Sequence, residues 1–180
     1  MLALLTVAAV SFATPAQSPH RVTLGFEALH VSDLKGDHDV LGPIDQSFVG
    51  APGGTAGYAY AFAEWFELGL ELSWAQLDAD QGPLSTMRYA ATGRFVVPLL
   101  DGRLGLSLLL GAGGIAHWLE GESSDGVVGF GGVGIRGEVA ESFGLFLDVR
   151  GGVGIALSNS AYTQDETSIV HGLAGFVWRL

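Results

Sequence analysis

The sequence predicts an all-β chain that forms an eight-stranded antiparallel up-and-down transmembrane β-barrel. Eight segments alternate large apolar residues with small or polar ones, which places the two sets on opposite faces of a sheet. The 28 glycines are spread through the apolar stretches, where each would weaken a helix by about 1 kcal/mol relative to alanine. The connections between the segments alternate between long and short, which is typical of membrane barrels.

Length and composition narrow the class of protein. A chain of 180 residues is long enough for one domain with a full core. The mean hydropathy is positive, at +0.39, although charged residues make up only 15% of the chain. Cysteine is absent, which excludes disulfides and thiolate metal sites. The net charge of −11 argues against a nucleic-acid partner, because such partners need a basic surface.

The amino-terminal residues 1–16 (MLALLTVAAVSFATPA) predict a cleaved signal peptide. The stretch carries no charge, and Thr14 and Ala16 fit the small residues of a cleavage site, with Ser11 and Ala13 as a second choice. It lacks the usual basic start, and it is shorter than the ~20 residues that span a bilayer as a helix. We therefore expect residues 17–180 to form the mature barrel domain.

Eight strands follow in order from residue 20. The alternation is clearest in the third segment, where Leu68, Leu70 and Leu72 alternate with Gly69 and Glu71. Each segment reaches the ~9–11 residues that a tilted transmembrane strand needs. The expected strands are 20–32, 54–63, 66–77, 86–98, 103–118, 126–139, 143–157 and 167–180.

The connections predict how the barrel is oriented. Short periplasmic turns and longer outer loops are typical of outer-membrane barrels, so a periplasmic amino terminus would place all the long connections outside. The long, polar connections are expected at 33–53, 78–85, 119–125 and 158–166. The short turns are expected at about 64–65, 99–102 and 140–142.

Charged residues on the strands predict a polar lumen. Seven arginines lie in the phase opposite the large apolar residues: Arg21, Arg88, Arg94, Arg103, Arg136, Arg150 and Arg179. An arginine facing lipid near the midplane costs ~2–4 kcal/mol, whereas arginine in a narrow lumen can pair with carboxylates. The expected structural network is Arg21, Glu27, Glu71, Arg88, Arg94, Arg136, Glu138, Asp148 and Arg150. A soluble sheet with one wet face is the alternative.

The repeated strand rhythm of residues 54–74 and the last strand, HGLAGFVWRL (171–180), resemble the small OmpA-, OmpX- and OmpW-like outer-membrane β-barrels. The resemblance covers residues 20–180 and implies a location in the Gram-negative outer membrane, among its lipids and lipopolysaccharide. It also implies recognition of the last strand by the barrel-assembly machinery, with Gly175, Trp178 and Leu180 matching its pattern. Leu180 stands where phenylalanine is commonest. Aromatic residues near the expected strand ends, such as Trp65 and Trp118, suit interfacial girdles.

Other motifs do not predict a cofactor. Residues 132–137 (GVGIRG) match the dinucleotide pattern G-x-G-x-x-G but lie within a strand, whereas that site needs a strand followed by a helix. Asp37/Asp39 and Asp78/Asp80 are paired carboxylates without a complete calcium loop. We expect no dedicated metal site, although divalent cations bridging these acidic loops to lipopolysaccharide is a hypothesis.

The five histidines show no zinc-binding spacing. His117 and His171 are expected near the outer mouth of the lumen, where a catalytic dyad with Ser158 or Ser160 is conceivable but has no signature. We expect no enzyme.

An eight-stranded barrel is just wide enough for side chains to fill. Large inward groups such as Phe130, Phe146 and His117 should plug it further. The sequence therefore predicts a structural or surface-interaction protein of the outer membrane, without porin activity. Three alternatives stay open: a narrow channel or carrier for small apolar molecules, a lipid A-modifying enzyme, and a soluble periplasmic barrel.

Overall fold

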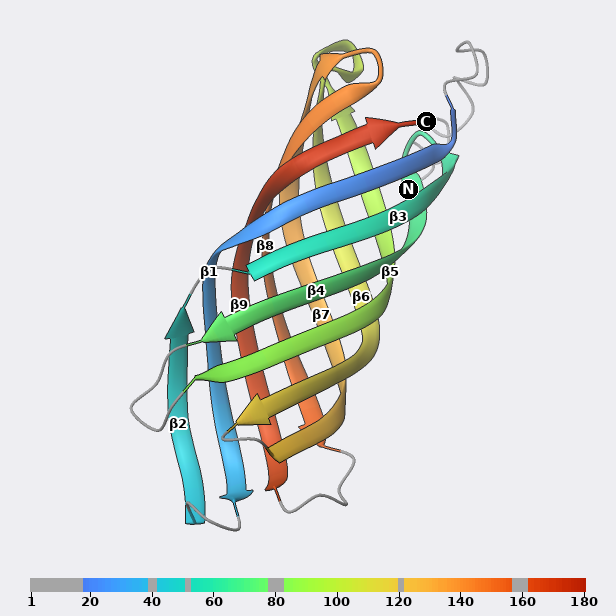
Figure 1. The fold of residues 1–180 in the computed structure, drawn as a ribbon. Coiled ribbons are helices and arrows are strands. Elements are labelled where there is room, and N and C mark those ends of the chain that lie inside the picture. Colours follow the sequence, from blue (N-terminus) through green and yellow to red (C-terminus); the bar gives the residue numbers. More distant parts are fainter. Residues whose placement is uncertain (1–17, 39–41, 51–52, 78–82, 120–121, 157–161) are drawn as a thin grey trace, which may run out of the picture.

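A computed structural model describes residues 18–38, 42–50, 53–77, 83–119, 122–156 and 162–180 (Figure 1). In these ranges the chain is almost entirely β-strand. The strands are β1 (His20–His38), β2 (Gly42–Gly50), β3 (Gly53–Ala63), β4 (Phe66–Leu77), β5 (Leu84–Leu99), β6 (Leu104–Leu119), β7 (Glu122–Ala140), β8 (Phe143–Ala156) and β9 (Tyr162–Arg179). One short 3₁₀ turn covers Leu100–Gly102. No helix in the described part of the chain is long and apolar enough to cross a membrane.

The strands close into a barrel. Each pairs antiparallel with its neighbour, and β1 also pairs with β9, which joins the two edges of the sheet (Figure 1). β3 pairs with residues 20–27 of β1 and β2 with residues 30–38, so these two strands share one position in the barrel. The prediction of an eight-stranded antiparallel barrel is confirmed.

The structure corrects three of the expected connections: 33–53, 119–125 and 158–166, the last because β9 already begins at Tyr162. Residues 33–53 were expected as a long polar connection, but β1 continues to His38 and pairs with β2 there. Residues 119–125 are also mostly strand, because β7 begins at Glu122. Beyond the apolar band a strand contacts no lipid, so neither of its faces needs to be apolar. The alternation of apolar and polar residues that indicates a strand is therefore absent from the sequence there. The expected signal peptide, residues 1–16, lies outside the described residues.

The barrel has two distinct ends. The amino and carboxyl ends of the described chain lie together with the turns at 64–65, 100–103 and 141–142, and we call this the inner end (Figure 1). The opposite end, where β1 and β2 form an extended hairpin, is the outer end. Gly102 adopts a φ of 85° in the second inner turn, a value that glycine reaches without strain.

The exterior of the barrel is apolar over its middle. Leu68, Leu70 and Leu72 on β4 are exposed, with 67% of Leu70 accessible. The same holds on β8 for Val149 and Val153. Side chains in the alternate positions of these strands face the lumen, so the buried core of this molecule is the inside of the barrel.

Aromatic side chains border this apolar band. At the inner end, Trp65 stacks on Phe95, with 6.3 Å between ring centroids and 17° between ring planes. On β8 and β9, Phe143 packs against Phe176 and Trp178. Toward the outer end, Trp74, Tyr89 and Trp118 are exposed. Two aromatic belts enclosing an apolar band are the expected surface of a barrel that crosses a bilayer.

Candidate functional site: the barrel lumen

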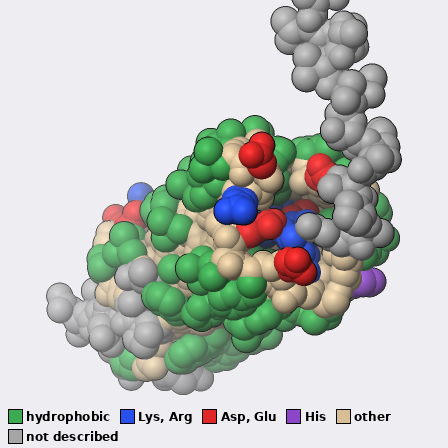
Figure 2. Space-filling view, turned by 90° about the horizontal axis from the view of Figure 1, so that it is seen from above, with side chains coloured by type: hydrophobic (Ala, Val, Ile, Leu, Met, Phe, Trp, Pro, Cys, Tyr) green, Lys and Arg blue, Asp and Glu red, His purple; other side chains and the backbone are tan. Residues whose placement is uncertain are grey.

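Charged side chains fill the inner half of the lumen. Seen from the inner end, acidic and basic groups lie in the mouth of the barrel inside a ring of hydrophobic side chains (Figure 2). They come from β1, β4, β5, β7, β8 and β9, from positions in phase with the lumen. A buried charge that lacks a partner is strongly destabilising, so the pairing of each group decides whether this arrangement is stable.

Glu67 on β4 is a buried carboxylate in this network. It is 2% exposed and accepts hydrogen bonds from two arginines. Arg136 Nη1 and Nη2 lie 2.7 and 3.3 Å from its two oxygens, and Arg21 Nη1 donates to Oε1 as well. Glu67 was not among the residues expected in the network, although it lies four positions before Glu71, on the same face of the strand. An even spacing from Glu71 on the same strand was therefore the feature of the sequence that indicates a lumen position for Glu67.

Asp148 on β8 organises the middle of the network. Arg94 donates two hydrogen bonds to it, at 3.0 and 2.6 Å, and Arg150 donates one at 2.9 Å. Arg150 also donates to Glu71 at 2.6 Å, which links the two carboxylates. A Cβ atom on Gly134, opposite on β7, would overlap Asp148 Oδ1, so glycine leaves the space that the carboxylate occupies.

Arg88 on β5 marks the outer limit of the network. Its Nη2 lies 3.7 Å from Glu71 and 3.8 Å from Glu27. Its guanidinium also lies over the ring of Phe130, 4.9 Å from the centroid, a geometry in which the cation is attracted to the ring face. Arg88 thus connects the charged inner half to the residues farther out.

At the inner mouth, Arg179 donates to Glu138, which is partly exposed. Arg21, Arg136 and Arg179 line a cavity of about 510 Å³ that opens at this mouth. Arg103 was expected on the lumen face, but it lies exposed beside the turn at 100–102. The expectation was wrong there because the strand phase no longer holds at the turn.

The outer half of the lumen is not the charged interior that the strand pattern predicted. Apolar side chains pack there, and the contiguous group, which we call the apolar plug, consists of Ala90, Leu109, Ile115, Val128, Phe130 and Ile169. Its member Leu109 reaches the charged section, where it pairs with Arg94. Leu77 and Leu84, which pair across β4 and β5 at their outer ends, are fully buried as well. Phe130, Phe146 and His117, which were expected to point inward, are all buried. The lumen therefore has a charged inner section and an apolar outer one.

Three histidines are buried in the lumen. His117 and His171 were expected in the lumen and are each 1% exposed, and His30 is buried beside them. His30 Nδ1 donates to Glu27 at 2.6 Å, and Arg88 donates to His171 Nδ1 at 3.2 Å. Ser158 and Ser160, the serines considered for a dyad, lie outside the described residues.

The comparisons with known proteins agree on the fold. No protein-family model matches the chain, and no characterised protein matches its sequence. Neisserial surface protein A (NspA) aligns with a TM-score of 0.63 at 11% identity, over 92% of this chain and all of that one. The outer membrane protein AlkL, solved in lipid bilayers, gives 0.57 at 16% identity, over 95% of each chain. The outer membrane protein OprG from Pseudomonas aeruginosa gives 0.50 at 11% identity, over 91% and 97%.

The chain therefore has the fold of the small eight-stranded outer-membrane β-barrels. Its own surface agrees with that class, since an apolar band between aromatic belts suits the hydrocarbon of a bilayer. An eight-stranded barrel of the outer membrane is the class that the fold and the surface define. A soluble periplasmic barrel, one of the open alternatives, would not expose so many leucines and valines over its middle.

Proposed function

We propose that the protein has a structural or surface-interaction role in the outer membrane, with a lumen that side chains close to solutes. The observation that carries this proposal is how the lumen is filled. A void lined by Glu67, Arg94 and Arg150 in the charged section has a volume of about 30 Å³, room for only about two water molecules at the ~10–15 Å³ that each requires. Leu109 of the apolar plug borders this void, and the other plug residues, with Leu77 and Leu84, are buried as well. The 510 Å³ cavity is a vestibule at the inner mouth.

Planar-bilayer recording tests the closed lumen. We expect no discrete conductance steps from the reconstituted wild-type barrel, with folding and insertion verified by a heat-modifiability gel. A variant that truncates the plug, Ile115→Ala with Val128→Ala and Ile169→Ala, is the matched comparison. Steady ion-conducting steps from the wild type would overturn the proposal and favour the narrow-channel alternative.

We propose no catalytic role for the barrel. In the lumen His30 contacts Glu27 and His171 contacts Arg88, an arrangement that supports packing of the network. Mass spectrometry of lipid A from cells with and without the protein tests this point. Identical lipid A spectra are expected, and a modification that depends on the protein would contradict the proposal.

The proposed partners are outer-membrane lipids, lipopolysaccharide and the barrel-assembly machinery. β9 closes the barrel against β1 and ends with the sequence that fits recognition by that machinery, including Gly175 and Trp178. We expect Trp178→Ala to slow assembly in cells more than Val139→Ala, a change at an exposed site near the end of β7. Equal assembly rates would contradict this part of the proposal.

On the outer side, we propose that divalent cations bridge acidic groups of the protein to lipopolysaccharide. A thermal stability that falls when a chelator is added would support this bridging, and a stability that ignores the chelator would contradict it.

A further inference from the structure

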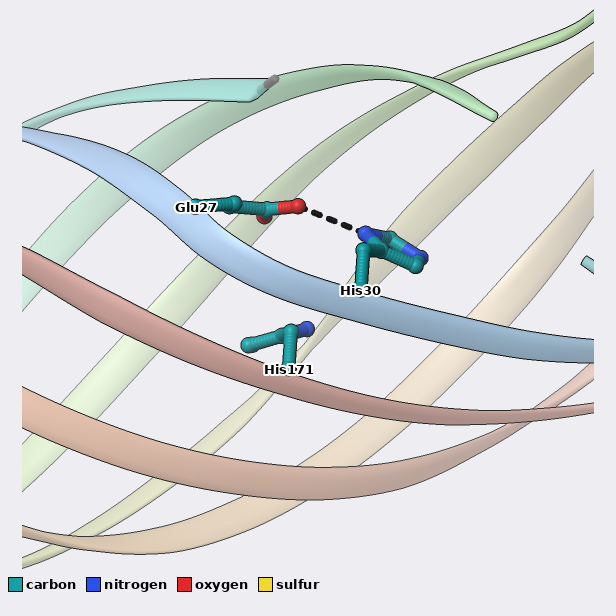
Figure 3. A group of neighbouring side chains, drawn as sticks. All are labelled: Glu27, His30 and His171. Atoms are coloured by element: carbon teal, nitrogen blue, oxygen red, sulfur yellow. Dashed lines mark hydrogen bonds and ion pairs between the residues drawn. The ribbon is translucent and has the colours of Figure 1, made fainter. Parts of the chain in front are cut away.

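Glu27, His30 and His171 bring three metal-ligating side chains together inside the barrel (Figure 3). Glu27 and His30 come from β1, and His171 comes from the neighbouring strand β9. One donor atom from each residue lies within 4.8 Å of the other two, and all three residues are buried. Nothing in the spacing of these residues along the sequence marks them as a group, because β1 and β9 are at opposite ends of the chain.

A β-bulge in β1 creates this arrangement. Residues three apart on a regular strand point to opposite faces, so Glu27 and His30 should not share the lumen. The register of β1 against β9 shifts between Glu27 and Leu29, and both side chains turn inward as a result. Bulges commonly re-aim a side chain next to a functional site.

The histidines near this bulge have unused nitrogen atoms. His30 Nε2 is buried with no hydrogen-bond partner, and so are both ring nitrogens of His117. His117 is 1% exposed and interacts electrostatically with His30. A buried polar atom without a partner is costly, and each such unpartnered group calls for an explanation. A bound metal ion would supply the missing partner for imidazole nitrogen.

We propose that Glu27, His30 and His171 form a site for a divalent first-row transition-metal ion of the Zn²⁺ class. Imidazole nitrogen and carboxylate oxygen are ligands that such ions accept, whereas Ca²⁺ and Mg²⁺ require mostly oxygen. Tetrahedral coordination at ~2.0–2.1 Å places ligand atoms about 3.3 Å apart. The separation is 2.6 Å between His30 Nδ1 and Glu27, and every pair of donor atoms lies within 4.8 Å, so small side-chain shifts suffice to reach that value.

Arg88 competes with the metal ion for this site. Its Nη1 and Nη2 lie 3.2 and 3.5 Å from the two ring nitrogens of His171, and Nη2 lies 3.8 Å from Glu27. A guanidinium only donates hydrogen bonds, so it occupies the lone pair that a metal ion needs. When the metal ion binds, Arg88 withdraws toward Glu71 and the ring of Phe130, which it already contacts. The site therefore alternates between two cations.

The test uses Co²⁺, because tetrahedral Co²⁺ has an intense visible absorption. The protein is purified without a histidine tag and titrated in detergent micelles. We expect one Co²⁺ per barrel with a tetrahedral spectrum, which Zn²⁺ displaces. His30→Asn and His171→Asn should each weaken the affinity by about 100-fold or more. Arg88→Gln should tighten it, because the competing cation is removed.

His20→Asn is the matched control, since His20 is exposed at the inner end, away from this site. Its affinity for Co²⁺ should equal that of the wild type. A heat-modifiability gel establishes that each variant is folded before titration. The proposal is overturned if the folded wild type gives no tetrahedral spectrum, or if His30→Asn and His171→Asn bind as the wild type does. Loss of binding in His20→Asn alone would assign the metal to the surface and would overturn it too.

Discussion

The inner and outer sections of the lumen are filled by side chains of opposite character, charged in the inner section and apolar in the outer one. The inner section is filled by arginines and carboxylates, with Glu67 and Asp148 each binding two arginines. The outer section is filled by the apolar plug. Truncating a plug residue leaves a cavity, whereas removing one carboxylate leaves buried cations without a partner. The two sections should therefore respond very differently to single substitutions.

The largest effect is expected from Glu67→Ala in the inner section. This change leaves Arg21 and Arg136 without their shared carboxylate, and breaking a buried ion pair in this way costs about 3–5 kcal/mol of unfolding free energy. Urea unfolding in lipid vesicles measures the loss. Replacing Arg136 by Met in the same chain should recover part of it, because one unpaired cation is then gone.

Glu141→Gln is the control for Glu67→Ala, because Glu141 is exposed in the inner turn at 141–142. Its unfolding free energy should stay near the wild-type value. A Glu67→Ala barrel as stable as the Glu141→Gln barrel would show that the inner charges do not depend on their pairing.

A smaller effect is expected when a charge is placed on the opposite face of the same strand. Leu70 lies midway along β4 and faces outward, so Leu70→Arg should cost about 2–4 kcal/mol in a bilayer. Val139→Arg, an exposed position near the end of β7, should cost about 0–1 kcal/mol, because it lies close to the interface. Equal losses at the two positions would contradict the placement of the apolar band.

In the apolar plug a conservative truncation should have a milder effect. Ile169 is 2% exposed, and Ile169→Val should cost about 0.5–1.5 kcal/mol through the small cavity that remains. Ile155→Val removes the same methylene from an outward-facing position on β8, where lipid fills the space, and should cost less. The same unfolding assay compares the two variants, and a larger loss for Ile155→Val would place Ile169 outside a packed interior.

The smallest effect concerns the hairpin beyond the outer section. Ser47 and Ser168 donate hydrogen bonds to Asp33, and these bonds lower the pKa of its carboxyl below the usual value. The lowered pKa means that the bonds favour the folded hairpin above the ordinary pKa and are lost as the pH falls through the lowered one. Ser168→Ala should raise the pKa of Asp33 toward its ordinary value, as measured by carboxyl NMR. An unchanged pKa would show that Ser168 makes no such bond in solution.

The sequence predicted the inner section better than the outer one, for a physical reason. An arginine such as Arg94 in a transmembrane strand is costly on the lipid-facing side. Its position in the alternation therefore shows which face of the strand points into the lumen. An apolar residue in a membrane barrel is stable facing either lipid or a packed lumen. Leu109 stands between Leu108 and Leu110, and its burial in the structure shows that it packs inside the lumen while its two neighbours are exposed.

The histidine cluster was beyond sequence reasoning for a different reason. A bulge breaks the strict alternation on which the strand analysis depends, so His30 falls in the wrong phase for a lumen residue. His171 joins Glu27 and His30 only when β9 closes against β1. Both facts depend on register, which one sequence does not contain.

The most direct test compares the methyl groups of apolar side chains that face lipid with those of apolar side chains that fill the lumen. In lipid nanodiscs, NMR cross-relaxation between acyl chains and labelled leucine, isoleucine and valine methyls reports which side chains touch lipid. We predict strong signals for Leu70, Val153 and Ile155, and none for Leu77, Ile115 and Ile169. Lipid contacts from the second group, or none from the first, would contradict the sorting of side chains on which the closed lumen depends.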